Sequence, residues 1–271
     1  MSEKYTVNDK LVQDSLRAIS FSNSISNIEL ILVGGMASQL HLRKDYGDFL
    51  RPTHDVDTVP SRPIVSHDFK GSLREHMFAF LQNEGYKTTN GKKTRYGFEL
   101  IINDQNDIFF IHLNKYPKSI YEKNKKTKDR EAENAVEFEI SSAENIKYSN
   151  RVRVFRVEDV ITNKIIRLKK LESHRVMGPS ERENFNILKM ERFDNLANIN
   201  FNDYLVKLIE ERAEMQKIAY DTEKFNNKIG TYKIRKDLYD ISLLAKGVVD
   251  KKLTFDQQYY KNALSDIKFF N

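Results

Sequence analysis

One strand-like segment, HDVDTV at residues 54–59, constrains this chain more than any other feature. Its two aspartates, Asp55 and Asp57, are separated by a single valine, and alternation along a strand points residues i and i+2 to the same face. The two carboxylates are therefore expected side by side, where they repel each other unless a positive charge compensates them. A shared divalent cation supplies such a charge, because it takes oxygen ligands. The other interpretation is an exposed strand edge on which water separates the two charges.

A glycine pair, Gly34-Gly35, ends the largely apolar run at residues 28–33. The run predicts a buried strand, and residues 36–46 predict a helix that begins directly after the glycines. Glycines at such a junction let the backbone approach a phosphate, while the helix N-terminus offers unpaired N–H groups and the positive end of its dipole. Ser38 lies just inside this helix, where its hydroxyl can reach an anion. Most such glycines only make a tight turn, so the signal becomes specific only in combination with the paired aspartates.

The composition narrows the class of protein. Lys and Arg outnumber Asp and Glu by 45 to 39, and the formal charge of +6 suits a nucleotide or nucleic-acid partner, although a lysine-rich surface gives the same excess. The chain has no cysteine, which excludes disulfides and thiolate metal sites. The polar N-terminus is unlike a signal peptide, and no apolar run approaches the ~20 residues that span a bilayer. A cytoplasmic protein with no membrane partner is therefore expected.

The pattern of elements changes about midway along the chain. Up to about residue 155, short strands alternate with helices: the spacing predicts helices over 7–22 and 72–85, and strands over 95–102, 107–113, 136–140 and 151–157. From Glu158 onwards the three-to-four spacing of a helix is almost continuous. We therefore predict an α+β fold, in which a mixed-sheet core at residues 1–156 is followed by a C-terminal helical bundle at residues 157–271.

The second half divides into helices at apparent loops. Helices are expected over 157–174, 181–193, 202–225, 233–246 and 255–270, with loops at residues 177–179, 197–200 and 227–231. In the first half, residues 121–134 are rich in charge and have no apolar face, so we expect a flexible loop there.

The order of the first motifs resembles a known superfamily. Gly34-Gly35-x-x-Ser38, followed by Arg51-x-Thr53-x-Asp55-x-Asp57, resembles the signature of the DNA-polymerase-β-like nucleotidyltransferases. The resemblance implies that the glycine-led helix, with Ser38, Arg51 and Thr53, contacts a nucleotide. It also implies that Asp55 and Asp57 bind Mg²⁺, together with a third acidic residue on a later strand.

The best candidate for this third ligand is Asp107, which opens the apolar strand DIFFIHL, and Glu99 and His112 compete with it. Strand parity puts Asp107 on the face of Phe109 and Ile111, and His112 on the opposite face. We interpret His112 as a buried histidine whose hydrogen bonds are satisfied. Asp107 has a second interpretation as a turn residue.

Two helices of the second half carry charge on their apolar sides. Lys164 lies within the stripe that residues 160, 161, 165, 168 and 171 form, where a lysine must be paired or must reach water. Asp237 borders the apolar face of another helix, KIRKDLYDISLLAK, and is the natural partner of Lys164.

These two helices, through EDVITNKIIRL and RKDLYDI, resemble the C-terminal motifs of AbiEii-type toxin nucleotidyltransferases, and the resemblance extends over residues 28–245. It implies a magnesium-dependent enzyme that moves a nucleoside monophosphate from a nucleoside triphosphate to RNA, with the tRNA 3′ end as the leading acceptor and a cognate antitoxin protein as partner. Lys164 would then neutralise phosphate charge, and Asp237 would orient Lys164 or bind the acceptor.

Two departures from that family stand in the same region. The interval between Gly35 and Asp55 is long, and Gly-Gly-Met-Ala-Ser replaces the Gly-Ser or Gly-Gly-Thr of its first motif. Two alternatives also stay open: a small-molecule nucleotidyltransferase of the aminoglycoside type, and a non-catalytic nucleotide-binding relative.

Overall fold

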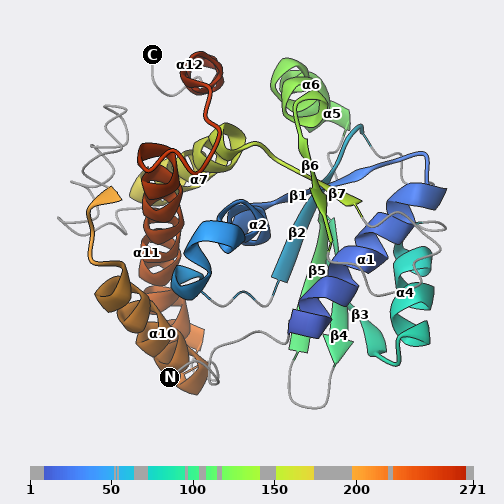
Figure 1. Ribbon diagram of the computed structural model, residues 1–271. Coiled ribbons are helices and arrows are strands. Elements are labelled where there is room, and N and C mark those ends of the chain that lie inside the picture. The colour runs from blue at the N-terminus through green and yellow to red at the C-terminus, as the bar shows by residue number, and fades with distance from the viewer. Residues whose placement is uncertain are drawn as a thin grey trace. The chain divides into compact units, whose positions relative to one another are not determined.

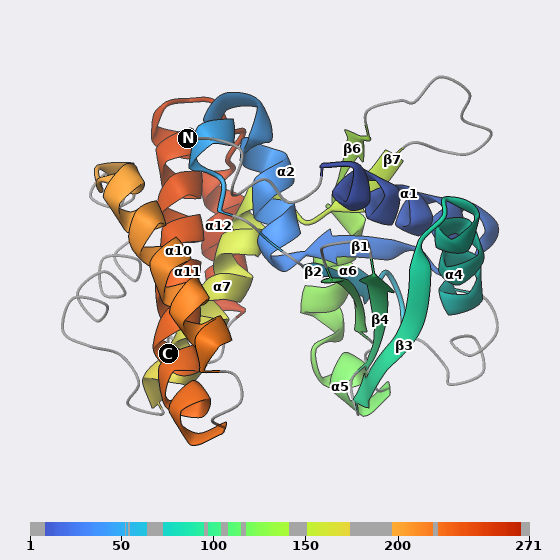
Figure 2. The same cartoon turned by 90° about the horizontal axis from the view of Figure 1, so that it is seen from below.

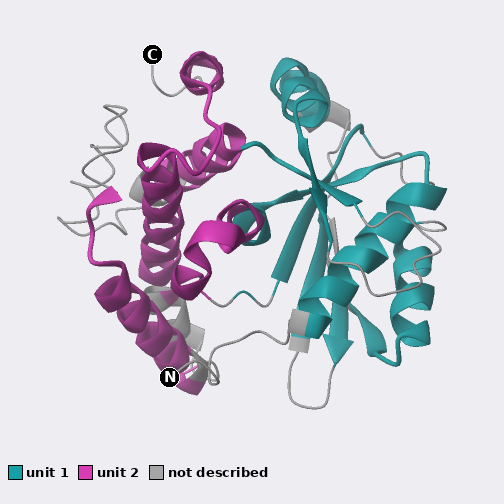
Figure 3. Ribbon diagram, in the orientation of Figure 1, with its two compact units in different colours: residues 1–37, 52–156 teal, residues 38–51, 157–271 magenta. Residues whose placement is uncertain are grey.

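The computed structural model describes residues 9–51, 53, 55–63, 73–94, 97–103, 108–114, 118–140, 151–173, 197–218 and 222–266. The helix expected over 181–193 lies outside these residues. The chain forms two compact units, shown in Figure 3: unit 1 holds residues 1–37 and 52–156, and unit 2 holds residues 38–51 and 157–271. The α+β class with a mixed sheet and a helical C-terminal region is confirmed.

Unit 1 is built on a seven-stranded sheet with the order β3-β4-β5-β2-β1-β7-β6 (Figure 1). The pairs β1–β7 and β2–β5 are parallel, and the other neighbouring pairs are antiparallel. Its elements are α1 (Asp9–Ile25), β1 (Leu30–Val33), the start of α2 (Gly34–Tyr46), β2 (Asp55–Pro60), α4 (Arg74–Asn83), β3 (Lys87–Thr94), β4 (Gly97–Asn103), β5 (Ile108–Asn114), α5 (Lys118–Lys123), α6 (Lys125–Glu133), β6 (Val136–Glu139) and β7 (Arg151–Val154).

One face of this sheet belongs to the core. Strand alternation and the register put one set of apolar side chains on that face, and all of them are buried: Leu30, Leu32, Val56, Leu100, Ile102, Phe109, Ile111 and Leu113. Helices α1 and α4 lie side by side against one side of the sheet (Figures 1 and 2), and their own apolar residues, such as Leu16 and Met77, are buried. The opposite face carries Asp55, Asp57 and His112, which are partly exposed.

The loop expected at residues 121–134 was a wrong prediction, because α5 and α6 occupy it. Two buried side chains anchor the helices: Tyr121, whose hydroxyl donates to Asp129, and Glu131, which accepts from Lys128 at 2.6 Å. Pairing within the segment thus satisfies charges that, read along the sequence, suggested a solvated loop. Strand β3 was not predicted, since KTTNGKKT lacks the apolar alternation of a strand with one buried face.

Unit 2 consists of helices in the part of the chain that the structure describes. They are the remainder of α2, the short 3₁₀ helix η1 (Gly47–Phe49), α7 (Val157–Ser173), α10 (Phe201–Lys217), α11 (Thr222–Val249) and α12 (Gln257–Ser265). Helices α10 and α11 lie along each other, and α7 contacts both α11 and α12 (Figure 2). None of the helices among the described residues combines the length and the apolar character needed to cross a bilayer.

The loop expected at residues 227–231 is absent, because α11 continues through it. Gly230 suggested the loop, but a glycine inside a helix lowers stability by only about 1 kcal/mol relative to alanine, and the packing of a long helix outweighs this loss. Further along α11, Ile234, Leu238 and Ile241 are fully buried and supply that packing.

Residues 38–51 belong to unit 2, so the units do not follow a single division at residue 156. Three contacts hold this segment to α11 and the turn after it. Tyr239 donates its hydroxyl to the carbonyl oxygen of Phe49 at 2.6 Å, Tyr46 donates to Asp250 at 2.7 Å, and Arg51 pairs with an aspartate of α11. Most of the long interval between Gly35 and Asp55 therefore belongs to the helical unit, and strand β2 of the sheet begins at Asp55.

Candidate functional site

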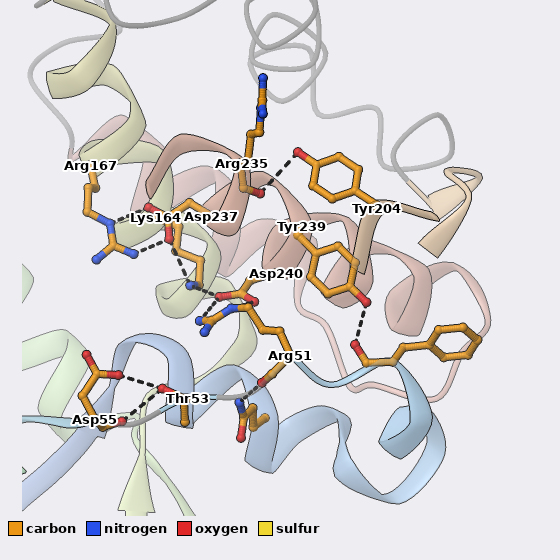
Figure 4. A network of polar contacts seen from close by, with 12 residues as sticks. Arg51, Thr53, Asp55, Lys164, Arg167, Tyr204, Arg235, Asp237, Tyr239 and Asp240 are labelled. Carbon is orange, nitrogen blue, oxygen red and sulfur yellow. Dashed lines mark hydrogen bonds and ion pairs between the residues drawn. The ribbon is translucent and has the colours of Figure 1, made fainter. Parts of the chain in front are cut away.

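The paired aspartates of β2 lie on one face, next to the centre of the sheet. In the parallel pairing with β5, Asp55 is opposite Phe110 and Asp57 is opposite His112. Thr53, which is 2% exposed, donates its hydroxyl to Oδ1 of Asp55 at 2.7 Å. This hydrogen bond fixes the direction of the Asp55 carboxylate (Figure 4).

Gly34 at the start of α2 fits closely against the second aspartate. Its φ is +70°, in the region that glycine adopts without the strain of a side chain. A Cβ atom at this position would lie 2.7 Å from Oδ2 of Asp57. The missing side chain therefore makes room for the carboxylate, and only glycine satisfies both requirements. Gly35 follows within α2 and does not have a positive φ.

His112 completes a polar row across three neighbouring strands. Glu99 of β4 is paired with His112 of β5, and His112 is paired with Asp57 of β2. The imidazole lies between the two carboxylates: Nδ1 is 3.0 Å from Oδ1 of Asp57, and Nε2 is 3.1 Å from Oε2 of Glu99. The three side chains are 25–31% exposed, so solutes have access to them.

The charges of the row favour the protonated imidazole. The hydrogen bond to Asp57 is the largest cause that raises the pKa of His112 to about 8. Burial opposes this shift, while the charges of Asp57 and Asp55 and the hydrogen bond to Glu99 add to it. A carboxylate only accepts hydrogen bonds, so an imidazolium that donates from both nitrogens is the partner that this row selects.

The donor set fits a divalent cation. One ligand atom each from Asp55, Asp57 and His112 lies within 4.8 Å of the others. Two atoms bound to one ion at about 2.1 Å lie at most about 4.2 Å apart, so small side-chain rotations bring all three onto one ion. Because Gly34 has no side chain, nothing from that position blocks Oδ2 of Asp57. Aspartate oxygens and a histidine nitrogen together are a common metal-binding set.

The interpretation of His112 as a buried histidine with satisfied hydrogen bonds was wrong in its first part: the side chain is 31% exposed, although both ring nitrogens have a hydrogen-bond partner. Its parity was assigned correctly, opposite Phe109 and Ile111, but that side of the strand is the one that faces the aspartates. The signal in the sequence was weak, because β2 alternates only from Asp55 to Asp57, and β5 (IFFIHLN) is apolar up to His112. Asp107 lies outside the described residues, and its role as third ligand stays a prediction.

Unit 2 holds a second polar group, here called the buried charge chain: Arg51, Asp240, Lys164, Asp237 and Arg167. Lys164 of α7 is 3% exposed, and its Nζ lies 3.3 Å from Oδ1 of Asp237 and 2.6 Å from Oδ2 of Asp240. Arg51 binds Asp240 with two hydrogen bonds of 2.8 Å, and Arg167 binds Asp237 (Figure 4). The pairing of Lys164 with Asp237 was expected from the sequence, whereas Asp240 and the two arginines were missed as partners.

Opposite charges alternate along this chain, and they keep both aspartates ionised. Burial alone raises the pKa of Asp240, but the charges of Arg51 and Lys164 and their hydrogen bonds outweigh it and hold that pKa well below its usual range. Burial likewise raises the pKa of Asp237, and the charges of Lys164 and Arg167 reverse the shift. Three cations thus enclose two carboxylates, which leaves the carboxylates no need for a metal ion.

The other residues predicted to bind a nucleotide are largely buried. Ser38 is 2% exposed within α2, and Arg51 is 6% exposed in its ion pair. Thr53 contacts Asp55. Their roles, and that of Lys164 at a phosphate, stay predictions.

Comparisons with known proteins add little. No protein-family model matches the chain, and a search of curated proteins finds no match. The solution structure of the antibiotic-resistance factor ANT(2'')-Ia matches with 14% sequence identity and a TM-score of 0.34, covering 79% of this chain and 99% of that one. A likeness this weak carries no argument, so the functional interpretation rests on the residues and their geometry.

Proposed function

We propose that this chain is a metal-dependent nucleotidyltransferase. The observation that carries the proposal is the arrangement of Asp55 and Asp57 on one partly exposed face of β2, with the glycine that begins α2 fitted against Asp57. The carboxylate pair, which suits a divalent cation, therefore lies next to the N-terminus of α2, which suits a phosphate. The first turn of α2 contains no acidic residue that would repel a phosphate.

Each residue of unit 1 has a defined part in this proposal. Asp55 and Asp57 hold the cation, and Thr53 keeps the Asp55 carboxylate in one orientation. Bound there, the cation supplies positive charge that offsets the charge of a nucleoside triphosphate. The backbone at Gly34 and Gly35 approaches the phosphates without a side chain in the way.

The proposed reaction transfers a nucleoside monophosphate. The oxygen of an acceptor hydroxyl forms a bond to the α-phosphorus, and the bond from that phosphorus to the oxygen bridging the α- and β-phosphates breaks. Pyrophosphate leaves with the electron pair, and the hydroxyl proton is lost to a carboxylate or to water. Catalysis in such a transfer consists mainly of positioning and charge stabilisation.

The helical unit enters the proposal through Lys164 and Asp237. The phosphate-neutralising role of Lys164 requires its Nζ to give up one of its two carboxylate partners when the nucleotide binds. Asp237, which also binds Arg167, then keeps Lys164 in place. Until that exchange occurs, the buried charge chain stabilises unit 2.

RNA is the proposed acceptor, and the tRNA 3′ end is the leading case. The resemblance of EDVITNKIIRL and RKDLYDI to the AbiEii-type toxins supports this choice, and so does the net charge of +6. A cognate antitoxin protein belongs to the same proposal. The cation expected from the resemblance is Mg²⁺.

The test is a transfer assay with radiolabelled nucleotides. The purified chain is incubated with Mg²⁺ or Mn²⁺, each nucleoside triphosphate in turn, and either total tRNA or a panel of aminoglycosides. Label on tRNA that disappears in Asp57→Asn supports the proposal. Glu84→Gln, which changes an exposed acid at the end of α4, is the matched control and retains transfer.

Two other outcomes decide against parts of the proposal. Label on an aminoglycoside and not on tRNA would replace RNA by a small-molecule acceptor while keeping the reaction class. Nucleotide binding without transfer to any acceptor would identify a non-catalytic nucleotide-binding protein.

A further inference from the structure

The polar row of unit 1 places a histidine nitrogen beside the two aspartates. Nδ1 of His112 lies 3.0 Å from Asp57, within reach of the same ion as the two aspartates. Its other nitrogen, Nε2, lies 3.1 Å from Glu99. The imidazole therefore has one nitrogen on the side of the aspartates and the other against a further carboxylate.

Glu99 determines which nitrogen is available to a metal. A carboxylate can only accept, so the nitrogen that faces Glu99 carries the hydrogen. Before a cation binds, the imidazolium donates from both nitrogens, to Asp57 and to Glu99. A bound cation takes the place of the hydrogen on Nδ1, while Nε2–H continues to donate to Glu99, and Nδ1 then presents its lone pair towards Asp55 and Asp57. A histidine whose second nitrogen donates to a carboxylate is the usual arrangement in metal sites, because it fixes the ring and strengthens the ligand.

A site of this composition discriminates between metal ions. Mg²⁺ prefers oxygen ligands alone and retains most of its water. Imidazole suits divalent transition metals, and carboxylates suit Mn²⁺ as well as Mg²⁺. Two aspartates with one histidine therefore favour Mn²⁺ over Mg²⁺.

We infer that His112 is the third protein ligand of the metal site, that Glu99 is its positioning residue, and that the site selects Mn²⁺ over Mg²⁺. The reaction that this metal serves rests on the proposed function. The binding preference itself depends only on the side chains of β2, β4 and β5.

The test measures metal binding directly on the full chain after treatment with a chelator. Free Mn²⁺ is followed by its electron paramagnetic resonance signal, and Mg²⁺ is added as competitor. We expect Mn²⁺ to bind at least about tenfold more tightly than Mg²⁺. Electron spin-echo modulation of the bound Mn²⁺ should show one directly coordinated nitrogen.

Three variants separate the roles of the side chains. His112→Asn should remove the nitrogen modulation and weaken Mn²⁺ binding, and His112→Asp should shift the preference towards Mg²⁺ by restoring an all-oxygen site. Glu99→Gln should weaken Mn²⁺ binding about tenfold while the nitrogen modulation persists. His76→Gln, on α4 of the same unit, is the histidine control and should bind like the wild type.

The outcomes distinguish this inference from the proposed function. Mn²⁺ binding without nitrogen modulation, or unchanged binding in His112→Asn, would overturn the inference even if transfer occurs with Mg²⁺. A nitrogen-coordinated Mn²⁺ in a chain that transfers nothing would support the inference and count against the proposed function. Circular dichroism of each variant verifies that it is folded, and because His112 is partly exposed, its replacement should not unfold unit 1.

Discussion

Two pairs of aspartates in this molecule look alike in sequence and differ in what surrounds them. Asp55 and Asp57 are two residues apart on a strand, and Asp237 and Asp240 are three apart on a helix, so in both cases the carboxylates share a face. The helical pair is buried with three cations around it. The strand pair is partly exposed and has His112 as its cationic partner, with Glu99 adding a third carboxylate nearby.

The helical pair is therefore a structural ion cluster, whereas the strand pair is a site that can bind a ligand. A buried charge is tolerated only when it is paired and hydrogen-bonded, and the buried charge chain meets that condition within the protein itself. The strand cluster carries an excess of negative charge that a bound cation would neutralise. Sequence spacing alone does not distinguish these cases, because the distinction depends on cations from distant segments such as Arg51.

The comparison predicts that replacing one aspartate of the helical pair by asparagine lowers stability, whereas the same change in the strand pair lowers activity. Asp240→Asn leaves Arg51 and Lys164 short of a buried counter-charge and should lower the free energy of unfolding by about 3–5 kcal/mol. Asp57→Asn relieves the repulsion from Asp55 but also loses the partly exposed ion pair with His112, so the two effects offset each other and that free energy should change by about 0.5 kcal/mol or less. The same Asp57→Asn change should reduce nucleotidyl transfer about 10²–10³-fold, since a metal ligand supplies several kcal/mol to the transition state.

Urea denaturation and the transfer assay measure both quantities. Equal destabilisation by the two variants would show that the strand pair is also a structural cluster, and the comparison would fail. Asp240→Leu is the second structural variant, because it separates the loss of charge from the loss of hydrogen bonding.

Gly34 at the start of α2 combines two constraints, its backbone conformation and the space beside Asp57, and two other glycines allow their effects to be separated. Gly34 has a positive φ and a potential Cβ clash with Asp57, Gly85 has a positive φ with open space, and Gly47 has neither. Gly34→Ala should weaken metal binding by about tenfold or more by displacing a ligand. Gly85→Ala should cost about 1–2 kcal/mol of stability without affecting metal binding, and Gly47→Ala should be close to neutral. Calorimetric titration of metal into each variant tests this order, and equal metal affinity in all three would show that Gly34 is needed only for its backbone conformation.

The buried charge chain predicts a specific dependence of stability on pH. The pKa values of Asp237 and Asp240 are lowered on folding from an ordinary value of 3.8, so the unfolded chain binds more protons in acid. Their stabilisation is complete above that value and is lost as the pH falls below it. Each depressed carboxyl should add a slope of about 1.4 kcal/mol per pH unit in that range. Denaturation series between pH 2 and 6 should show a shallower slope in Asp240→Asn, and an identical slope would contradict the assigned ion pairs.

Local patterns in the sequence were enough for most of unit 1 and for the helical character of unit 2. Strand parity put Asp55 and Asp57 on one face, and the apolar run before Gly34 gave β1 and the start of α2. The pairing of Lys164 with Asp237 also followed from local reasoning, because a lysine inside an apolar stripe needs a partner.

The features that escaped prediction depend on contacts between distant segments. Arg51 and Asp240 are separated by 189 positions, and no local pattern relates them. The neighbour of Asp57 across the sheet is His112 only because β2 and β5 pair in one particular register. Burial of Tyr121 likewise turns a charge-rich segment into helix. In each case the decisive energy comes from tertiary packing, which overrides local propensity.

The smallest expected effect concerns two threonines that are equally buried but differently bonded. Thr53 donates to Asp55 at 2.7 Å, whereas the hydroxyl of Thr162 in α7 is buried without a hydrogen-bond partner, and each residue is 2% exposed. Thr53→Val should weaken Mn²⁺ binding about tenfold, because residues that orient a metal ligand contribute on that scale. Thr162→Val should leave binding unchanged and stability equal or slightly higher, since it removes an unsatisfied polar group. If Thr53→Val bound metal as well as the wild type, Asp55 would be oriented by the ion itself, and the exposed pair would be less preorganised than the buried one.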